Sequence, residues 1–225
     1  MILFILILVV TGGISLWAMA SLKSTYARYL KVPVRSGLNG AQTAAHILEK
    51  AGIYDVEIVQ GESMLGDHYD PSHKRLVLSP DNYHGTSVAA VGVAAHECGH
   101  ALQHQARYGA LEMRMAAVGA VQFGQPVLLY GGMAVMIFFS AYLGTVLMAA
   151  GMGLLMLFQL ITLPVEFDAS ARAKHVLADM GIIQGEQEIQ GVNKVLNAAA
   201  MTYVAAFITA LAWTLYYLLP LLLRR

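Results

Sequence analysis

The stretch MAAVGAVQFGQPVLLYGGMAVMIFFSAYLGTVLMAAGMGLLMLFQLITLPV, from Met115 to Val165, decides the fold. None of its 51 residues is Asp, Glu, Lys or Arg. A membrane-spanning helix needs about 20 predominantly apolar residues, so the stretch is long enough for two. A turn near Ser140–Gly144 predicts helices over about 115–139 and 143–164. Pro126 indicates that the first part of this stretch is either kinked or still near the membrane interface. The stretch therefore predicts a transmembrane hairpin.

Two further uncharged stretches flank this hairpin, from Ile2 to Leu22 and from Val195 to Leu223. Each is long enough for one more span. Hydrophobic residues make up 57% of the chain and charged residues only 12%, against about 25% charged in an ordinary soluble domain. The fold class predicted is a mainly α, polytopic membrane protein with about four transmembrane helices. The net charge of zero argues against a nucleic-acid partner, because phosphate binding needs a basic surface.

Basic residues predict the orientation of these spans. Nine of the 14 Lys and Arg residues lie between residues 23 and 114, and three more lie between 166 and 194. Positive charge beside a span is retained in the cytoplasm, and Arg224 and Arg225 alone oppose this assignment. We expect an N-terminal anchor (1–22), a cytoplasmic region (23–114), a transmembrane hairpin (115–165), a second cytoplasmic segment (166–194) and a C-terminal transmembrane helix (195–225).

The sequence His96-Glu97-Cys98-Gly99-His100 carries the chemistry. It lies within a helix predicted over about 87–105, so positions four apart share one face and both histidines can bind one metal ion. Glu97 is placed to take a proton from a water held by the metal and to deliver it to a leaving amine. A single Zn²⁺ fits best, since two imidazoles and a carboxylate leave a fourth position open. This predicts residues 23–114 to be the catalytic region.

A third ligand is required, and three residues are candidates. His104 lies one turn beyond His100, and three ligands spaced four apart would spread about 12 Å along the helix axis, which disfavours it. Glu166 is the first charge after the apolar hairpin, which returns it to the side of the membrane where the histidines lie. A carboxylate at the mouth of a span is costly without a partner, so Glu166 is favoured. Asp168 is the better candidate for a group that supports a ligand.

The segment before the metal-binding helix predicts a small α+β element. Ala41–Lys50 has the pattern of an amphipathic helix. Val56–Val59 and Arg75–Leu78 are predicted strands, separated by the turn-rich Gly66–Pro71. Beyond the hairpin, a helix is expected to continue from Glu166 until Gly181 ends it.

Three segments together resemble a known family. They are AAHECGHALQH (94–104), DHYDPSHKRLVLS (67–79) and LPVEFDASARA (163–173), and they are similar to the YugP-type membrane zinc metallopeptidases, neutral zinc metallopeptidase family 2. The resemblance implies His96 and His100 as ligands and Glu97 as the catalytic residue. The more distant similarity to the HtpX proteases and the CAAX prenyl endopeptidase implies a zincin-like fold with Glu166 as third ligand. Those relatives place an Asp where this chain has Ser170, so Asp168 is the candidate to substitute for it.

Analogy with the same broader group, the gluzincins, implies how a substrate binds. Asp67–Ser79 would supply an edge strand beside the metal-binding helix, and an extended peptide would pair with that edge. His68, Tyr69 and His175 are candidates for stabilising the oxyanion that forms on the scissile carbonyl. The expected partners are a protein or peptide substrate and the lipid bilayer.

The function predicted is a zinc-dependent membrane metalloendopeptidase. It would cleave membrane-associated or misfolded proteins at the cytoplasmic face of the bacterial plasma membrane. An intramembrane protease is disfavoured, since the polar residues 103–107 follow the motif and residues 115–165 contain no Asp. A non-catalytic membrane scaffold stabilised by zinc is the second alternative, and Glu97 discriminates against it because a structural site does not need that acid.

Overall fold

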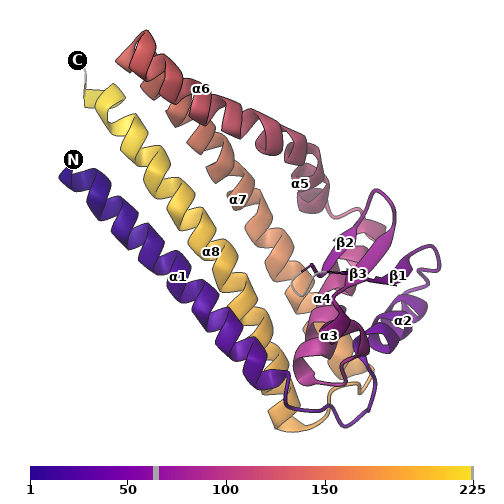
Figure 1. The fold of residues 1–225 in the computed structure, drawn as a ribbon. Helices are drawn as coiled ribbons and strands as arrows, with labels where there is room; N and C mark the ends of the chain where they lie inside the picture. The colour runs from indigo at the N-terminus through magenta and orange to yellow at the C-terminus, as the bar shows by residue number, and fades with distance from the viewer. Residues whose placement is uncertain (63–65, 224–225) are drawn as a thin grey trace. The chain divides into compact units, whose positions relative to one another are not determined.

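The computed structural model describes residues 1–62 and 66–223, which form two compact units (Figure 1). The helical unit comprises Met1–Met19, Glu112–Pro164 and Met201–Arg225, and the mixed unit comprises Ala20–Leu111 and Val165–Ala200. Arg224 and Arg225, which opposed the predicted orientation, lie outside the described residues.

Within residues 1–62 and 66–223, four helical segments are long and apolar enough to cross a membrane, which confirms the predicted polytopic, mainly α fold. Their mean hydropathies over the most apolar windows lie between 1.4 and 2.5, and little of each window is buried within the protein. Lipid can therefore cover the apolar side chains that the fold leaves exposed. The segments are α1 (Ile2–Tyr29), α5 to α6 (Gly109–Phe138), α7 (Ala141–Asp179) and α8 (Gly185–Leu223).

The hairpin turns where the sequence predicted, at Phe139 and Ser140. The first arm consists of α5 (Gly109–Gly119), a π-helical turn, η1 (Ala120–Gly124), and α6 (Gln125–Phe138). The π-helical turn ends just before Pro126, and a proline at the start of α6 lacks the N–H that a continuous α-helix would use. The Ser140 hydroxyl accepts the N–H of Leu143 in the first turn of α7, at 3.3 Å.

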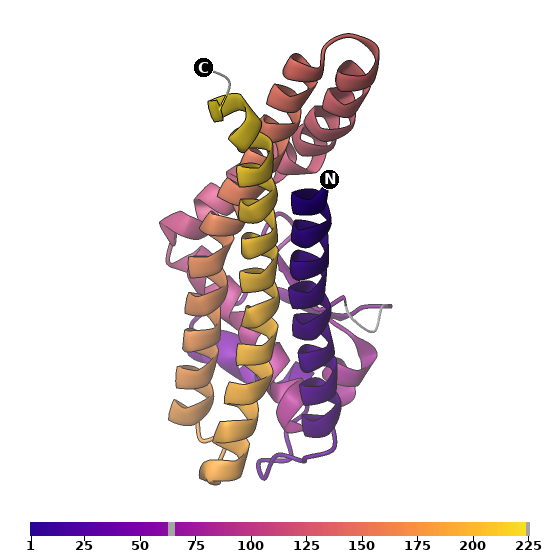
Figure 2. The ribbon, with the colours of Figure 1, turned by 90° about the vertical axis from the view of Figure 1, so that its left-hand side faces the viewer.

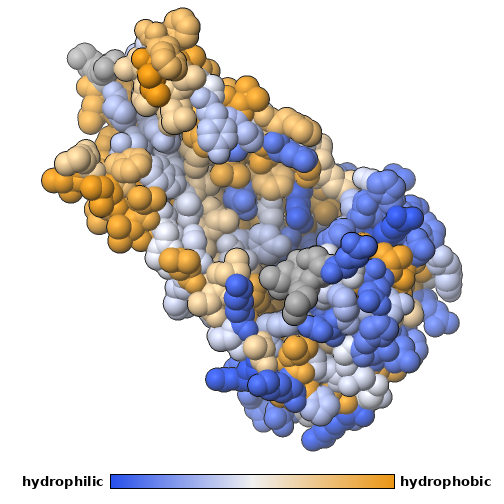
Figure 3. Space-filling model, in the orientation of Figure 1, coloured by the Kyte–Doolittle hydropathy of each residue, from blue (hydrophilic) through white to orange (hydrophobic). Residues whose placement is uncertain are grey.

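Helices α1 and α8 lie side by side within the helical unit (Figures 1 and 2). The ring of Phe4 meets Trp213 edge-on, with centroids 5.3 Å apart, and meets Tyr216 at 6.0 Å. Further along the pair, the hydroxyls of Ser15 and Thr209 are 3.4 Å apart. Apolar side chains gather on the surface of the helical unit, whereas the surface of the mixed unit is largely hydrophilic (Figure 3).

The mixed unit contains a three-stranded sheet in the order β1-β3-β2. Strand β1 (Glu57–Gln60) runs parallel to β3 (Arg75–Leu78), and β2 (His68–Asp70) runs antiparallel to β3. The sequence predicted a turn over Gly66–Pro71, but three of these residues form β2. The tight turn follows at 71–74, where Lys74 has a positive φ of 50°.

Two helices pack with this sheet around a shared core. Helix α2 (Gly40–Lys50) begins with a reciprocal capping box between Asn39 and Gln42, and the Ser87 hydroxyl caps α4 (Val88–Gln105). A short helix that the sequence did not predict, α3 (Pro80–His84), joins the sheet to α4. Ile47, Leu76 and Leu78 are completely buried in the core, and burial of side chains of this size contributes about 1.5–3 kcal/mol each.

The parts of α7 and α8 that belong to the mixed unit complete this core. Gly181 ends α7 in the left-handed conformation, with φ of 63°, as the sequence predicted. In the first turn of α8, the buried carboxylate of Glu188 accepts the backbone N–H of Gln184 at 2.7 Å and that of Arg35 at 3.1 Å. These two bonds hold the turn between the helices against the segment that follows α1.

Candidate metal centre

His96 and His100 lie four residues apart on α4, and Glu166 reaches them from α7. The Nε2 atom of His96 is 3.3 Å from Glu166 Oε2, and that of His100 is 3.7 Å from the same oxygen. All three ligand atoms lie within 4.8 Å of one another. Ligands at about 2.0–2.1 Å from a tetrahedral zinc ion stand about 3.3 Å apart. The two imidazoles and the carboxylate therefore fit one Zn²⁺ in number, chemistry and spacing.

Each ligand histidine has a hydrogen-bonding partner at its other ring nitrogen. Ser170 Oγ lies 3.2 Å from His96 Nδ1, and Gln103 Oε1 lies 3.0 Å from His100 Nδ1. Ser170 is one helical turn beyond Glu166 and therefore on the same face of α7. It occupies the position where the HtpX-type relatives carry Asp, and it makes a contact to a ligand histidine. Such contacts orient metal ligands.

The sequence reasoning did not identify Gln103 as a residue of the site, although its spacing from His100 pointed to it. Gln103 lies three residues after His100 on the same helix, a spacing at which side chains can meet. Its Nε2 donates to Asp168 Oδ2 at 2.8 Å, and Asp168 also accepts from Arg172 Nε at 2.6 Å. Asp168, predicted to support a ligand, thus connects to His100 through Gln103.

Glu97 is buried beside the cluster, with 7% of its surface exposed. Burial raises its pKa to about 7; the nearby Glu166 carboxylate adds to this rise, and His96 opposes it. A carboxyl group that exchanges its proton near neutrality suits general acid–base chemistry. Glu97 is therefore a buried acid with a raised pKa beside the cluster, and its catalytic role stays a prediction.

His68 is exposed on strand β2, and its charge opposes, more weakly than that of His96, the rise in the Glu97 pKa that burial causes. Its Nδ1 is 2.6 Å from the carbonyl oxygen of Gly66. His175 lies nine residues beyond Glu166, about 180° around α7. It is largely exposed and pairs with Asp179 at 3.2 Å, which places it outside the cluster.

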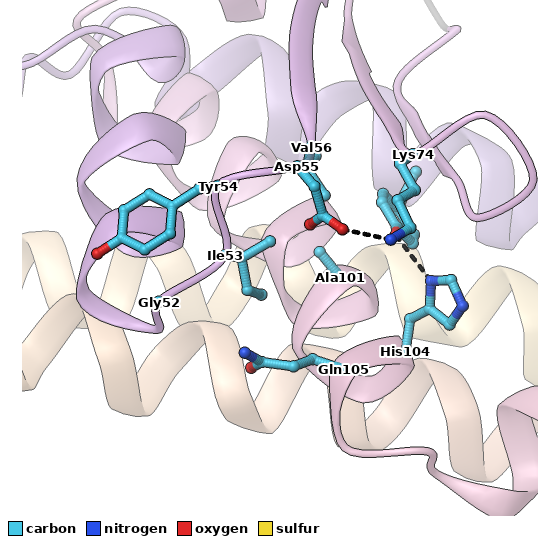
Figure 4. A pocket seen from close by; sticks show the side chains of 10 residues that line it. Gly52, Ile53, Tyr54, Asp55, Val56, Lys74, Ala101, His104 and Gln105 are labelled. Carbon is cyan, nitrogen blue, oxygen red and sulfur yellow. Dashed lines mark hydrogen bonds and ion pairs between the residues drawn. The ribbon is translucent and has the colours of Figure 1, made fainter.

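Tyr69 and His104 meet elsewhere, at a cavity of about 400 Å³ next to the end of α4 (Figure 4). The Tyr69 hydroxyl hydrogen-bonds His104 Nδ1 at 2.8 Å. Burial raises the pKa of Tyr69 to about 12. Asp55 and Lys74, which also line the cavity, form an ion pair with each other. The two side chains therefore bond to each other, and this contact agrees with the prediction that His104 is not a metal ligand.

Within the described residues, the four candidate spans and the His–His–Glu cluster define the class of protein as a polytopic membrane protein with a zinc site. Over residues 2–222 the chain matches, and belongs to, the family described as "Putative neutral zinc metallopeptidase". It is 45% identical over 212 residues to "Putative membrane protease YugP" of Bacillus subtilis (strain 168), which covers 93% of this chain and 92% of that relative. No solved structure matches the chain significantly. The predicted family and the zinc cofactor are confirmed.

Proposed function

We propose that this protein is a zinc-dependent endopeptidase that cleaves membrane-associated or misfolded proteins at the cytoplasmic face of the bacterial plasma membrane. One observation carries the proposal: a buried acid, Glu97, directly follows the first residue of the His96–His100–Glu166 cluster. A zinc ion that only held the fold together would not need this acid. The scaffold alternative leaves Glu97 without a role.

His96, His100 and Glu166 would hold the ion. When bound, zinc lowers the pKa of a water to about 7 and polarises the carbonyl of the scissile bond. Glu97 accepts a proton from the attacking water as the new C–O bond forms. The same carboxyl group then delivers the proton to the amine nitrogen as the C–N bond breaks. Because burial has raised its proton affinity, Glu97 can serve as base and acid in one turnover.

Strand β2 is the proposed substrate-binding edge. In the described part of the sheet, β2 pairs on one side with β3, and its other side can accept an extended peptide through backbone hydrogen bonds. His68 is the candidate for the oxyanion donor, since it lies on β2 and its charge acts on the buried carboxyl group of Glu97. Tyr69 is engaged with His104, and His175 lies on the opposite face of α7.

The cytoplasmic location of the site rests on charge. Twelve of the 14 basic residues lie in residues 23–114 and 166–194, the segments that carry the ligands. Positive charge beside a span retains a segment on the cytoplasmic side. The residues of the hairpin turn, Phe139 and Ser140, carry no charge and fit the opposite side.

Zinc removal and restoration test the proposed activity. The full-length protein, reconstituted in lipid vesicles, is incubated with an unfolded protein that is anchored in the same vesicles. Hydrolysis should cease when a chelator removes zinc and return on stoichiometric zinc. A zinc-loaded protein that cleaves neither anchored nor free unfolded substrates would support the scaffold instead.

A further inference from the structure

We propose that Gln103 is a positioning residue that fixes the tautomer of His100 and couples this ligand to the carboxylate of Asp168 on α7. The inference rests on the proposed zinc site and adds to it a residue that selects which nitrogen of His100 faces the metal.

The side chain of Gln103 is completely buried and makes three hydrogen bonds. Its Oε1 lies 3.0 Å from His100 Nδ1. Its Nε2 lies 2.8 Å from the carbonyl oxygen of Val165 and 2.8 Å from Asp168 Oδ2. The amide thus joins α4 to α7 immediately behind the metal-binding residues.

These partners determine the orientation of the amide. A backbone carbonyl oxygen can only accept a hydrogen bond, and so can an ionised carboxylate. Asp168 is already the acceptor for Arg172 Nε, at 2.6 Å. Both contacts therefore use the two hydrogens of the Gln103 amide nitrogen. The amide oxygen must then face His100.

The orientation of the amide in turn determines the tautomer of His100. An amide oxygen accepts only, so the hydrogen must sit on His100 Nδ1. The lone pair of the neutral ring is then on Nε2, the atom that lies 3.7 Å from Glu166 Oε2. Gln103 thus presents His100 to the metal in its ligating form before any ion arrives.

The two ligand histidines differ in this respect. The partner of His96 is the hydroxyl of Ser170, which can rotate and can either donate or accept. The partner of His100 is the amide oxygen of Gln103. This amide is the last member of a chain of hydrogen bonds that runs from Arg172 through Asp168. Hydrogen bonds in such a chain polarise one another, so the carboxylate increases the basicity of the ligand through the amide. Of these two contacts, the one to Gln103 determines where the ring proton lies, whereas the one to Ser170 fits either tautomer.

The first test reads the tautomer directly in the metal-free, full-length protein. Nitrogen-15 NMR of ring-labelled histidine in lipid should show His100 with its hydrogen on Nδ1 alone. Gln103→Met, which keeps the length of the side chain and loses both hydrogen-bonding groups, should give a mixture of tautomers. Gln105→Met is the matched control, because Gln105 is exposed on the same helix and bonds Ala51. An unchanged His100 signal in Gln103→Met would overturn the inference.

The second test measures zinc affinity by competition with a chelator. Loss of an outer partner of a metal-binding histidine typically weakens affinity by about 10–100-fold, and we expect a loss of this size for Gln103→Met. Asp168→Leu should cause a smaller loss. Because Asp168 acts through Gln103, combining the two changes should weaken binding no further than Gln103→Met alone.

Two outcomes of the affinity test contradict the inference. The first is that Asp168→Leu binds zinc as tightly as the wild type. The second is that the losses of zinc affinity caused by Gln103→Met and Asp168→Leu add up in the double variant. Asp168 is partly exposed, so its variant is expected to fold even if Gln103→Met does not. Neither readout depends on peptide hydrolysis. A protein that shows the expected tautomer and zinc affinity but cleaves nothing would overturn only the proposed function.

Discussion

The carbonyl oxygen of Ala169 on α7 lies 2.5 Å from the position that a Cβ atom on Gly99 of α4 would occupy. Real Cβ atoms do not approach a backbone oxygen this closely. The two helices can therefore pack at this distance only because residue 99 is glycine. The same close packing brings Glu166, three residues before Ala169, within 3.3–3.7 Å of the two ligand histidines.

Gly99→Ala should therefore disrupt the metal centre. The added methyl group forces α7 away from α4, and we expect zinc affinity to fall by at least about tenfold, as for the loss of a group that orients a ligand. The measurement is zinc competition on purified protein. Gly92→Ala is the control on the same helix, since its Cβ would meet Val192 side-chain atoms at an ordinary 3.6 Å. Equal affinity in the two variants would show that the close packing does not position Glu166.

His68→Ala should lower kcat and leave zinc content and KM nearly unchanged. Removal of one oxyanion donor typically costs about 10²–10³ in kcat. The measurement is steady-state cleavage of an unfolded substrate, with zinc content determined on the same samples. His46→Ala, a change at an exposed histidine on α2, serves as the control. A loss confined to KM would assign His68 to substrate binding rather than to the transition state.

The metal-free protein should lose stability as pH rises from about 4.5 to 7. Burial raises the pKa of Glu97 from its ordinary 4.5 to about 7. Across this range the unfolded chain has released the proton and the folded chain still holds it, so unfolding becomes progressively easier. Glu97→Gln abolishes this pH-dependent loss, which lowers the free energy of unfolding by about 3 kcal/mol at most.

Thermal unfolding in detergent, without zinc, measures this effect. The variant should exceed the wild type in Tm at pH 8 by much more than at pH 4.5. Comparing the two proteins at each pH cancels the titration of groups that they share. The same Tm difference at both pH values would contradict a raised pKa for Glu97.

Cysteine labelling in intact cells tests the proposed orientation. Cys98 is the protein's single cysteine, and it is completely buried on α4. Ser140→Cys, at the hairpin turn, should react with a membrane-impermeant maleimide added outside. Glu49→Cys, on the exposed surface of α2, should react only after the cells are opened. Labelling in the reverse order would place the metal centre on the outer face.

The sequence predicted the elements whose signals are local or compositional. Uncharged stretches identified the four spans, and Gly181 marked a helix end. His96, Glu97 and His100 follow from one helical spacing, and Glu166 follows from the return of the hairpin. These inferences depend on few residues, so tertiary packing could not overturn them.

The features that the sequence did not predict depend on contacts between distant segments. Strand β2 contains Asp and follows Gly66 and Asp67, which favour turns, yet pairing with β3 outweighs that preference. In the sequence, Gln103 is a polar residue near the end of a helix. Its contact to His100 gains a purpose only when its hydrogen bonds to Asp168 and to the Val165 carbonyl on α7 are known. Ser170 looked like the loss of a supporting group, but its hydroxyl still reaches His96.

The most direct test of the central claim compares hydrolysis and zinc content in purified wild-type protein and Glu97→Gln. Glutamine keeps the shape of the side chain and cannot transfer the proton. Zinc content should remain at one ion per chain while cleavage of the unfolded substrate falls by about 10²–10⁴-fold, the usual contribution of general acid–base catalysis. Glu49→Gln, at an exposed glutamate, should cleave like the wild type. Cleavage by zinc-loaded Glu97→Gln at the wild-type rate would contradict the account.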